Sequence, residues 1–241
     1  AIDPLAEKYY KLNPYAYCAD NPVNAIDING DSVQMNQVMA MDKIYNTDYN
    51  NKINKDLSYI TGLQLSNTDT GQLQYKKDTN GNPIIDESSS GSLTARKILM
   101  SILDSKETLD VFLYMKGQSS TPNNTLQIGL SALQINSFID KTSSDLDSRT
   151  LGWGMVFLHE LLHSKLGHGL VDSFIPFTTG DVVDKINTIR KELGGKFGQR
   201  LSYPAVIIDK NAYIPFDTSS LRAVQNGFQP SNNSKYIFLS Y

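Results

Sequence analysis

The feature that most constrains this chain is the stretch 158–163, LHELLH, which contains an HExxH pattern. On a helix, residues four apart share a face, so His159 and His163 can bind one metal ion from the same side. Glu160 lies about 100° further round the helix, within reach of a water molecule at that metal. Zinc lowers the pKa of bound water, and a carboxylate can accept the proton as the water attacks a carbonyl. The motif predicts a zinc site with Glu160 as the general base of a peptidase.

The surroundings of the motif favour this interpretation. Residues 152–165, GWGMVFLHELLHSK, lack proline and are apolar on nearly every face, which predicts a buried central helix. The three histidines of the chain also fall close together, at positions 159, 163 and 168. The alternative is a pair of hydrogen-bonded core histidines with Glu160 at the surface. A buried helix has no structural need for two histidines and a glutamate, so the metal site is the preferred hypothesis.

A catalytic zinc site needs a third protein ligand, and the sequence leaves its identity open. His168 follows Gly167, which could end the helix and turn the chain back. The stretch is similar to the metzincin pattern HExxHxxGxxH, but His168 lies five residues after the second histidine, where that pattern needs six. Asp184 lies near where gluzincins place a metal carboxylate on a following helix, although acids also favour the first helical turn. Two further candidates are Asp172 and Glu192.

A second group of residues lies downstream, at 198–203 (GQRLSY). A peptidase must stabilise the oxyanion of its tetrahedral intermediate, which the Arg200 guanidinium and the Tyr203 hydroxyl could do from opposite the zinc. The alternative is a surface arginine with a core tyrosine. HExxH followed by RxxY resembles the clostridial neurotoxin light chains. It also resembles a family of secreted bacterial effector zinc peptidases, through 187–194 (NTIRKELG) and 200–203 (RLSY), which implies catalytic roles for Arg200 and Tyr203.

The first thirty residues carry a different resemblance. The segment DPLAEKYYKLNPYAYCADNPVNAIDINGD is similar to the C-terminal end of an Rhs-repeat-associated core, with departures from its usual pattern at Asn13 and Ile28. This resemblance implies that the chain beyond about Asp31 is the variable tip of a large repeat protein, often a toxin or effector. It further implies secretion or display at the cell surface, delivery into a target cell, a repeat shell in the parent chain and an immunity protein as partner.

The composition argues against several other classes of protein. At 241 residues, with 40% hydrophobic and 20% charged residues, the chain is long enough to bury a core. Its net charge of −3 and the lack of a basic patch argue against a nucleic-acid-binding surface. No apolar run approaches the roughly 18 residues of a membrane span. The single cysteine, Cys18, excludes an internal disulfide framework and a CxxC zinc knuckle.

Hydrophobic periodicity and turn signals predict mixed helices and strands over the rest of the chain. The predicted helices lie within 33–44, 53–60, 92–103, 179–193 and 221–225. Ser90 or Ser92 is the predicted cap of the third. The predicted strands form hairpins over 63–75 and 205–216 and single strands over 111–115, within 126–138 and over 236–240. The run 126–138 is the candidate edge strand to which a substrate peptide would add by β-augmentation.

Together these features predict an α+β fold, a zincin-like domain over 31–241 behind a core fragment over 1–30. The predicted function is a zinc-dependent metalloendopeptidase acting on a protein or peptide as the toxin or effector tip of an Rhs-repeat protein. One alternative is a catalytically inactive zincin-like binding module on a surface repeat protein. Another is a metal-assisted hydrolase whose substrate is not a peptide.

Overall fold

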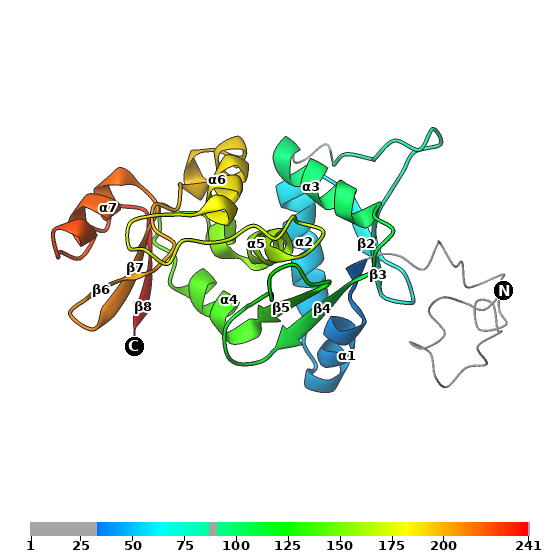
Figure 1. Ribbon diagram of the computed structural model, residues 1–241, viewed down its shortest axis with the longest axis horizontal. Helices are drawn as coiled ribbons and strands as arrows, with labels where there is room; N and C mark the ends of the chain where they lie inside the picture. The colour runs from blue at the N-terminus through cyan, green and yellow to red at the C-terminus, as the bar shows by residue number, and fades with distance from the viewer. Residues whose placement is uncertain (1–32, 87–90, 241) are drawn as a thin grey trace.

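The computed structural model describes residues 33–86 and 91–240, which form a mixed α+β fold with two sheets (Figure 1). The predicted α+β class is confirmed for these residues. The predictions made for residues 1–30, and the domain boundary at about residue 31, lie outside the described residues. None of the helices that the structure describes is long and apolar enough to cross a membrane.

The larger sheet has five strands in the order β2-β3-β1-β4-β5. Its strands are β1 (Val33–Gln34), β2 (Leu65–Asn67), β3 (Gln72–Tyr75), β4 (Leu109–Tyr114) and β5 (Gln127–Ser131). The β2–β3 hairpin is antiparallel, β1 pairs antiparallel with β3 and parallel with β4, and β5 pairs parallel with β4. Strand β5 therefore lies at one edge of the sheet, next to the helix that carries HExxH.

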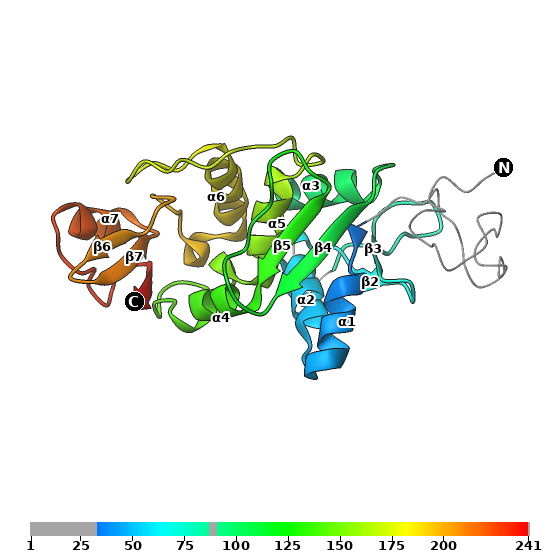
Figure 2. The same ribbon diagram turned by 60° about the horizontal axis from the view of Figure 1, so that its bottom comes forward.

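The helices of the described residues pack on this sheet and on one another, except the last of them in the chain, which packs on the smaller sheet (Figure 2). They are α1 (Asn36–Tyr45), α2 (Tyr49–Thr61), α3 (Leu93–Leu103), α4 (Ala132–Asp140), α5 (Trp153–His163), α6 (Asp181–Leu193) and α7 (Thr218–Gln225). Helix α5 is the central one, in contact with α2, α6 and β5. The approach of α5 to α2 requires a glycine, because a Cβ on Gly154 would lie 2.8 Å from the Asp56 backbone carbon. This packing buries α5 on nearly every face, as predicted.

The smaller sheet is antiparallel, in the order β6-β7-β8, and α7 packs on it. Its strands are β6 (Val206–Ile208), β7 (Asn211–Pro215) and β8 (Tyr236–Ser240). Figures 1 and 2 place it at the opposite end of the molecule from β2 and β3. The predicted hairpin over 205–216 and the strand over 236–240 are confirmed.

Most of the remaining predicted elements are also confirmed, and local sequence explains them. The prediction of a helix from Val33 is wrong at its start, because Val33 lies in strand β1 and helix α1 begins at Asn36. Helix α2 buries residues three and four apart, Ile53, Leu57 and Ile60, which form one apolar stripe against the core. Helix α3 begins where a cap was predicted, since the Ser92 side chain accepts a hydrogen bond from the Ala95 N–H at 3.0 Å. Ser90 lies outside the described residues.

The strand predicted within 126–138 is confirmed as β5, at the edge of the larger sheet. It ends at Ser131, after which the chain continues as α4. The Ser131 side chain caps this helix by accepting a hydrogen bond from the Gln134 N–H at 3.3 Å, which ends the strand. The outer edge of β5 is only partly free to pair with a substrate peptide, because Ser120 pairs with Gly129 through two backbone hydrogen bonds of 3.0 Å.

Candidate metal centre

The geometry of the site depends on how helix α5 ends. The helix stops at His163, and the next six residues make a tight turn through the hydrogen bonds Gly169 N to Ser164 O, 2.9 Å, and Leu170 N to Leu162 O, 3.0 Å. Gly167 makes this turn possible, because a Cβ there would lie 2.0 Å from the Leu161 carbonyl oxygen. The chain thus returns along the last turn of α5 and brings residues 170–172 beside its histidines.

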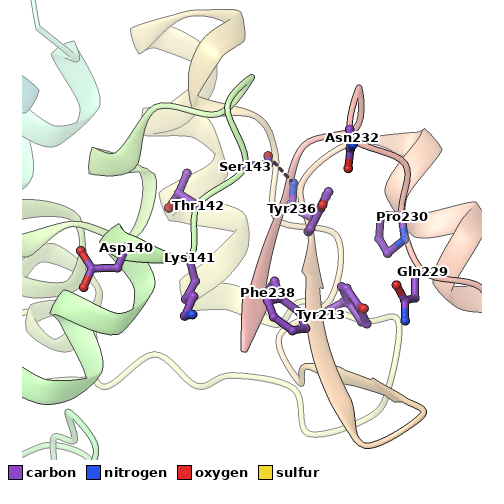
Figure 3. Close-up of a pocket in the computed structure, with 10 residues that line it drawn as sticks. All are labelled: Asp140, Lys141, Thr142, Ser143, Tyr213, Gln229, Pro230, Asn232, Tyr236 and Phe238. Atoms are coloured by element: carbon purple, nitrogen blue, oxygen red, sulfur yellow. Dashed lines mark hydrogen bonds between the residues drawn. The ribbon is translucent and has the colours of Figure 1, made fainter. Parts of the chain in front are cut away.

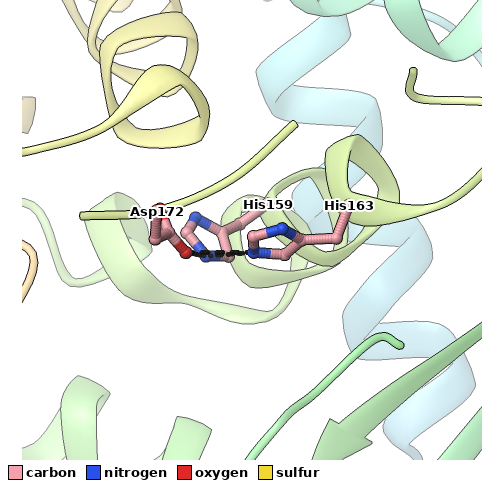
Figure 4. Close-up of side chains that lie close together, drawn as sticks. All are labelled: His159, His163 and Asp172. Carbon is pink, nitrogen blue, oxygen red and sulfur yellow. Dashed lines mark hydrogen bonds and ion pairs between the residues drawn. The ribbon is translucent and has the colours of Figure 1, made fainter. Parts of the chain in front are cut away.

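Three potential ligand atoms meet at this point (Figure 4). Asp172 Oδ2 lies 3.0 Å from His159 Nε2 and 3.0 Å from His163 Nε2, and the two nitrogens are 3.3 Å apart. Two tetrahedral zinc ligands at their usual bond lengths lie about 3.4 Å apart. The separations observed for His159, His163 and Asp172 are therefore close to those of a three-ligand zinc site.

The orientation of these side chains also fits metal binding. His163 Nδ1 lies 2.7 Å from the Leu170 carbonyl oxygen, which fixes its proton on Nδ1 and leaves the Nε2 lone pair directed at the cluster. Asp172 Oδ1 is buried and has no hydrogen-bond partner among the described residues. An orphaned buried carboxylate oxygen is costly, and a cation would offset that cost.

The electrostatics of His159 and Asp172 agree with their metal-binding forms. Burial lowers the pKa of His159, which keeps its imidazole neutral. Burial alone would raise the pKa of Asp172, but hydrogen bonding to His159 and His163 outweighs it and holds that pKa well below its usual range. A neutral imidazole and an ionised carboxylate are the forms that coordinate a metal. Burial would lower the pKa of His163, but hydrogen bonding to Asp172 and to the Leu170 carbonyl raises it, so a metal must displace a proton from this imidazole. Two imidazoles and one carboxylate suit zinc, and the same donor set also serves non-haem iron(II).

Glu160 lies beside this cluster but is almost fully buried. Its Oε2 accepts a hydrogen bond of 2.9 Å from the Thr121 hydroxyl. Burial raises the pKa of Glu160 to about 7, and this pKa suits a group that accepts and returns a proton near neutral pH. Thr121 belongs to a segment that the Asn124 N–H ties to the His163 carbonyl oxygen at 3.1 Å. No local sequence signal points to Thr121, because its contact with Glu160 spans 39 positions.

Tyr203 reaches the cluster from the other side. Its ring is stacked on that of His159, with the ring centroids 5.9 Å apart and the planes 5° from parallel. Burial raises the pKa of Tyr203 to about 12, so its hydroxyl stays protonated and can act as a donor. The structure thus brings Tyr203 next to His159, from a segment 40 residues downstream of His163.

Arg200 is buried near Tyr203, but backbone atoms engage its guanidinium. Its Nε donates to the Ser202 carbonyl oxygen at 3.0 Å, and its Nη2 donates to the carbonyl oxygen of Tyr203. Its guanidinium carbon lies 4.8 Å from the centre of the Tyr203 ring. In this geometry Arg200 positions Tyr203 instead of pointing at a substrate.

Asn187 holds this segment in turn. Its Nδ2 donates to the Arg200 carbonyl oxygen at 2.8 Å, and its Oδ1 accepts from the Arg200 N–H at 2.9 Å and from Arg190 Nη1 at 3.0 Å. Arg190 is fully buried and also donates to the Thr150 carbonyl oxygen at 2.9 Å. These residues, which we call the Asn187 junction, fix the start of the strip 200–203 against α6.

The other candidates for the third ligand lie elsewhere. His168 is exposed on the turn after α5, with a φ of 72°. Asp184 is exposed on α6 and accepts a hydrogen bond of 2.6 Å from the Thr179 hydroxyl. Glu192 caps the start of α3, where it accepts a hydrogen bond of 2.9 Å from the Thr94 N–H. The structure brings none of these three side chains to the two histidines, and brings Asp172 instead.

A separate pocket of about 390 Å³ lies between the end of α4 and the smaller sheet (Figure 3). Its walls include the aromatic rings of Tyr213, Tyr236 and Phe238. None of the residues that line it belongs to the His–His–Asp cluster. The pocket therefore takes no part in the chemistry of the metal centre.

Comparison with known proteins adds no relative: no family model, no curated protein and no solved structure matches this chain.

Proposed function

We propose that this chain is a zinc-dependent metalloendopeptidase with a zincin-like fold. One observation carries the proposal: a single oxygen, Asp172 Oδ2, lies 3.0 Å from the Nε2 atoms of both HExxH histidines. His159, His163 and Asp172 would hold the zinc and leave its fourth position open. A zinc ion bound there supplies Lewis acidity, which polarises a peptide carbonyl and acidifies an attacking water.

The chain's own residues supply the remaining chemistry. Glu160 accepts the proton of the attacking water and later donates it to the leaving amine. The Tyr203 hydroxyl donates a hydrogen bond to the oxyanion that develops on the substrate carbonyl. Arg200 holds the Tyr203 backbone and so sets the direction of that hydroxyl. Thr121 holds the Glu160 carboxylate.

The biological setting extends the same proposal. The resemblance of residues 1–30 to an Rhs-repeat-associated core supports a role as the toxin or effector tip of a secreted or cell-surface repeat protein. Its partners would be a protein substrate, the repeat shell of the parent chain and an immunity protein. Co-purification of the parent chain, with and without the tip, is the direct way to find the immunity protein.

The catalytic part is tested with Glu160→Gln. This variant keeps the three proposed ligands, so it should bind one zinc per chain with the wild-type affinity. It should cleave peptides at least about 100-fold more slowly, because proton transfer by a positioned group is worth about that much or more. Full activity in the variant would exclude Glu160 as the general base.

A second candidate is a zincin-like binding module without turnover. The observation that favours it is the burial of Glu160, whose side chain is only 6% exposed and is engaged by Thr121. A carboxylate closed off from water cannot shuttle protons. This candidate predicts one zinc per chain together with no cleavage of any peptide by the wild type.

A further inference from the structure

Beside the metal centre, the loop 171–178 presents large apolar side chains to solvent. Phe174 is 81% exposed, Ile175 67% and Val171 48%. The loop starts one residue before Asp172, so these side chains are close in sequence to a proposed metal ligand. Contiguous exposed apolar groups of this kind mark interaction sites on soluble proteins.

Backbone and side-chain hydrogen bonds hold the loop 171–178 in place. An isolated antiparallel bridge between Asp172 and Gly180 closes its base. The Phe177 N–H donates to the Ser202 hydroxyl at 3.1 Å, and the Tyr203 N–H donates to the Thr178 carbonyl oxygen at 2.8 Å. These bonds fasten the loop to the strip that carries Tyr203. The backbone is thus fixed in a form that keeps apolar surface in water, which is unfavourable unless a partner covers it.

A row of rings connects the loop to the metal centre. The Phe174 ring meets the Tyr203 ring edge-on, with centroids 5.7 Å apart. Tyr203 is in turn stacked on His159 at 5.9 Å. A ligand bound at the open side of the cluster and extending past Tyr203 would therefore meet Phe174 and Ile175.

We propose that the loop 171–178 binds a large apolar side chain of the substrate peptide, next to the bond that is cleaved. This inference rests on the proposed peptidase function and adds the substrate class to it. The ligand is a peptide with an aromatic or branched aliphatic residue close to the scissile bond. Burying such a side chain is worth about 10-fold or more in affinity.

A membrane surface is the less suitable occupant for these side chains. Loops and helices that bind membranes combine apolar residues with lysines or arginines that attract anionic lipid. Residues 171–180, VDSFIPFTTG, contain neither, and the chain carries a net charge of −3. Peptide binding next to a catalytic centre needs no such charges.

The test uses the full chain and a library of random octapeptides. The binding arm measures which peptides are retained by zinc-loaded Glu160→Gln, with and without the double substitution Phe174→Ser and Ile175→Ser. Both side chains are mostly exposed, so their replacement leaves the core intact. The matched control is Phe228→Ser, which removes an aromatic ring that is 69% exposed after the end of α7, outside the loop 171–178.

The expected result is a set of retained peptides enriched in Phe, Tyr, Trp, Leu or Ile at one position. The double substitution should reduce that enrichment about 10-fold, and Phe228→Ser should leave it unchanged. The inference is overturned by an unchanged profile in the double variant, by peptides with no apolar preference or by no retention of peptides. Loop-dependent binding to vesicles of phosphatidylcholine and phosphatidylglycerol, in place of peptides, also overturns it.

A cleavage arm separates this inference from the function on which it rests. Wild-type protein is incubated with the same library, and the new peptide ends are identified by mass spectrometry. Cleavage without apolar preference would leave the peptidase in place and remove the subsite. Loop-dependent retention of apolar peptides without cleavage would do the reverse, leaving the subsite on a binding module.

Discussion

Replacing Asn187 with leucine tests the Asn187 junction. Leucine has a similar volume but makes none of the three hydrogen bonds that Asn187 makes. The Arg200 N–H, the Arg200 carbonyl and Arg190 Nη1 would each lose a partner at 2.8–3.0 Å. Neither arginine pairs with a carboxylate at salt-bridge distance among the residues that the structure describes, although Asp172 attracts the Arg200 charge from further away.

The magnitude follows from those three lost bonds. Leaving a buried polar group unsatisfied costs about 1–3 kcal/mol. The lower figure applies here, because Asn187 is only partly buried and water can reach some of the vacated positions. We therefore expect the free energy of unfolding to fall by about 3 kcal/mol. This is a large share of the roughly 5–15 kcal/mol that stabilises a typical domain.

Urea denaturation followed by circular dichroism measures this change. With a slope of about 3 kcal/mol per molar urea, the midpoint should fall by about 1 M. The matched variant Asn187→Asp keeps both accepted bonds and adds a carboxylate beside the Arg190 guanidinium, so it should lose less stability than Asn187→Leu. A leucine variant within about 0.5 kcal/mol of the wild type, or an aspartate variant less stable than the leucine one, would refute the reasoning.

Three further predictions concern single contacts. Gly167→Ala puts a Cβ 2.0 Å from the Leu161 carbonyl oxygen, so it should lower the thermal midpoint and weaken zinc binding together; normal zinc affinity would show that the turn is not needed. Thr121→Val removes the hydrogen bond that lowers the pKa of Glu160, so the acid limb of the pH–rate profile should move to higher pH; an unmoved limb would count against the contact. Burial alone would raise the pKa of Glu192, but hydrogen bonds from the start of α3 outweigh it and lower that pKa. The stabilisation by Glu192 is therefore present above the unfolded pKa of about 4.3 and disappears as the pH falls further. Glu192→Gln should thus cost about 0.5–1 kcal/mol in urea at pH 7 and nothing at about pH 3, and an equal cost at both would refute this.

Local signals were enough to predict most of the fold. Helical spacing of apolar residues predicts α2 and α6, and alternation around turn residues predicts the hairpins. Helix α4 was not predicted but could have been, because Ser131 and Gln134 form the S-x-x-Q pattern that starts helices. Helix α5 ends at His163, two residues before the predicted end, since the turn through Gly167 begins there.

The third position of the metal cluster was harder to predict. The ligand spacing of other zinc peptidases favours His168 and Asp184 as the third ligand, whereas the structure brings Asp172 to the two histidines. The distance of nine residues from His163 to Asp172 works only because the chain turns back within six residues. The contact of Thr121 with Glu160 depends on the packing of β5 against α5, which no local pattern encodes.

The most direct test of the central claim is the zinc affinity of the purified chain, measured by competition with a chromogenic chelator. Metal analysis of the same samples would identify any other ion that is bound. We predict one zinc per wild-type chain, at least about 100-fold weaker binding in Asp172→Asn, and wild-type affinity in Asp184→Asn and His168→Ala. Wild-type affinity in Asp172→Asn, or no metal bound by the wild type after zinc is supplied, would contradict the proposed centre.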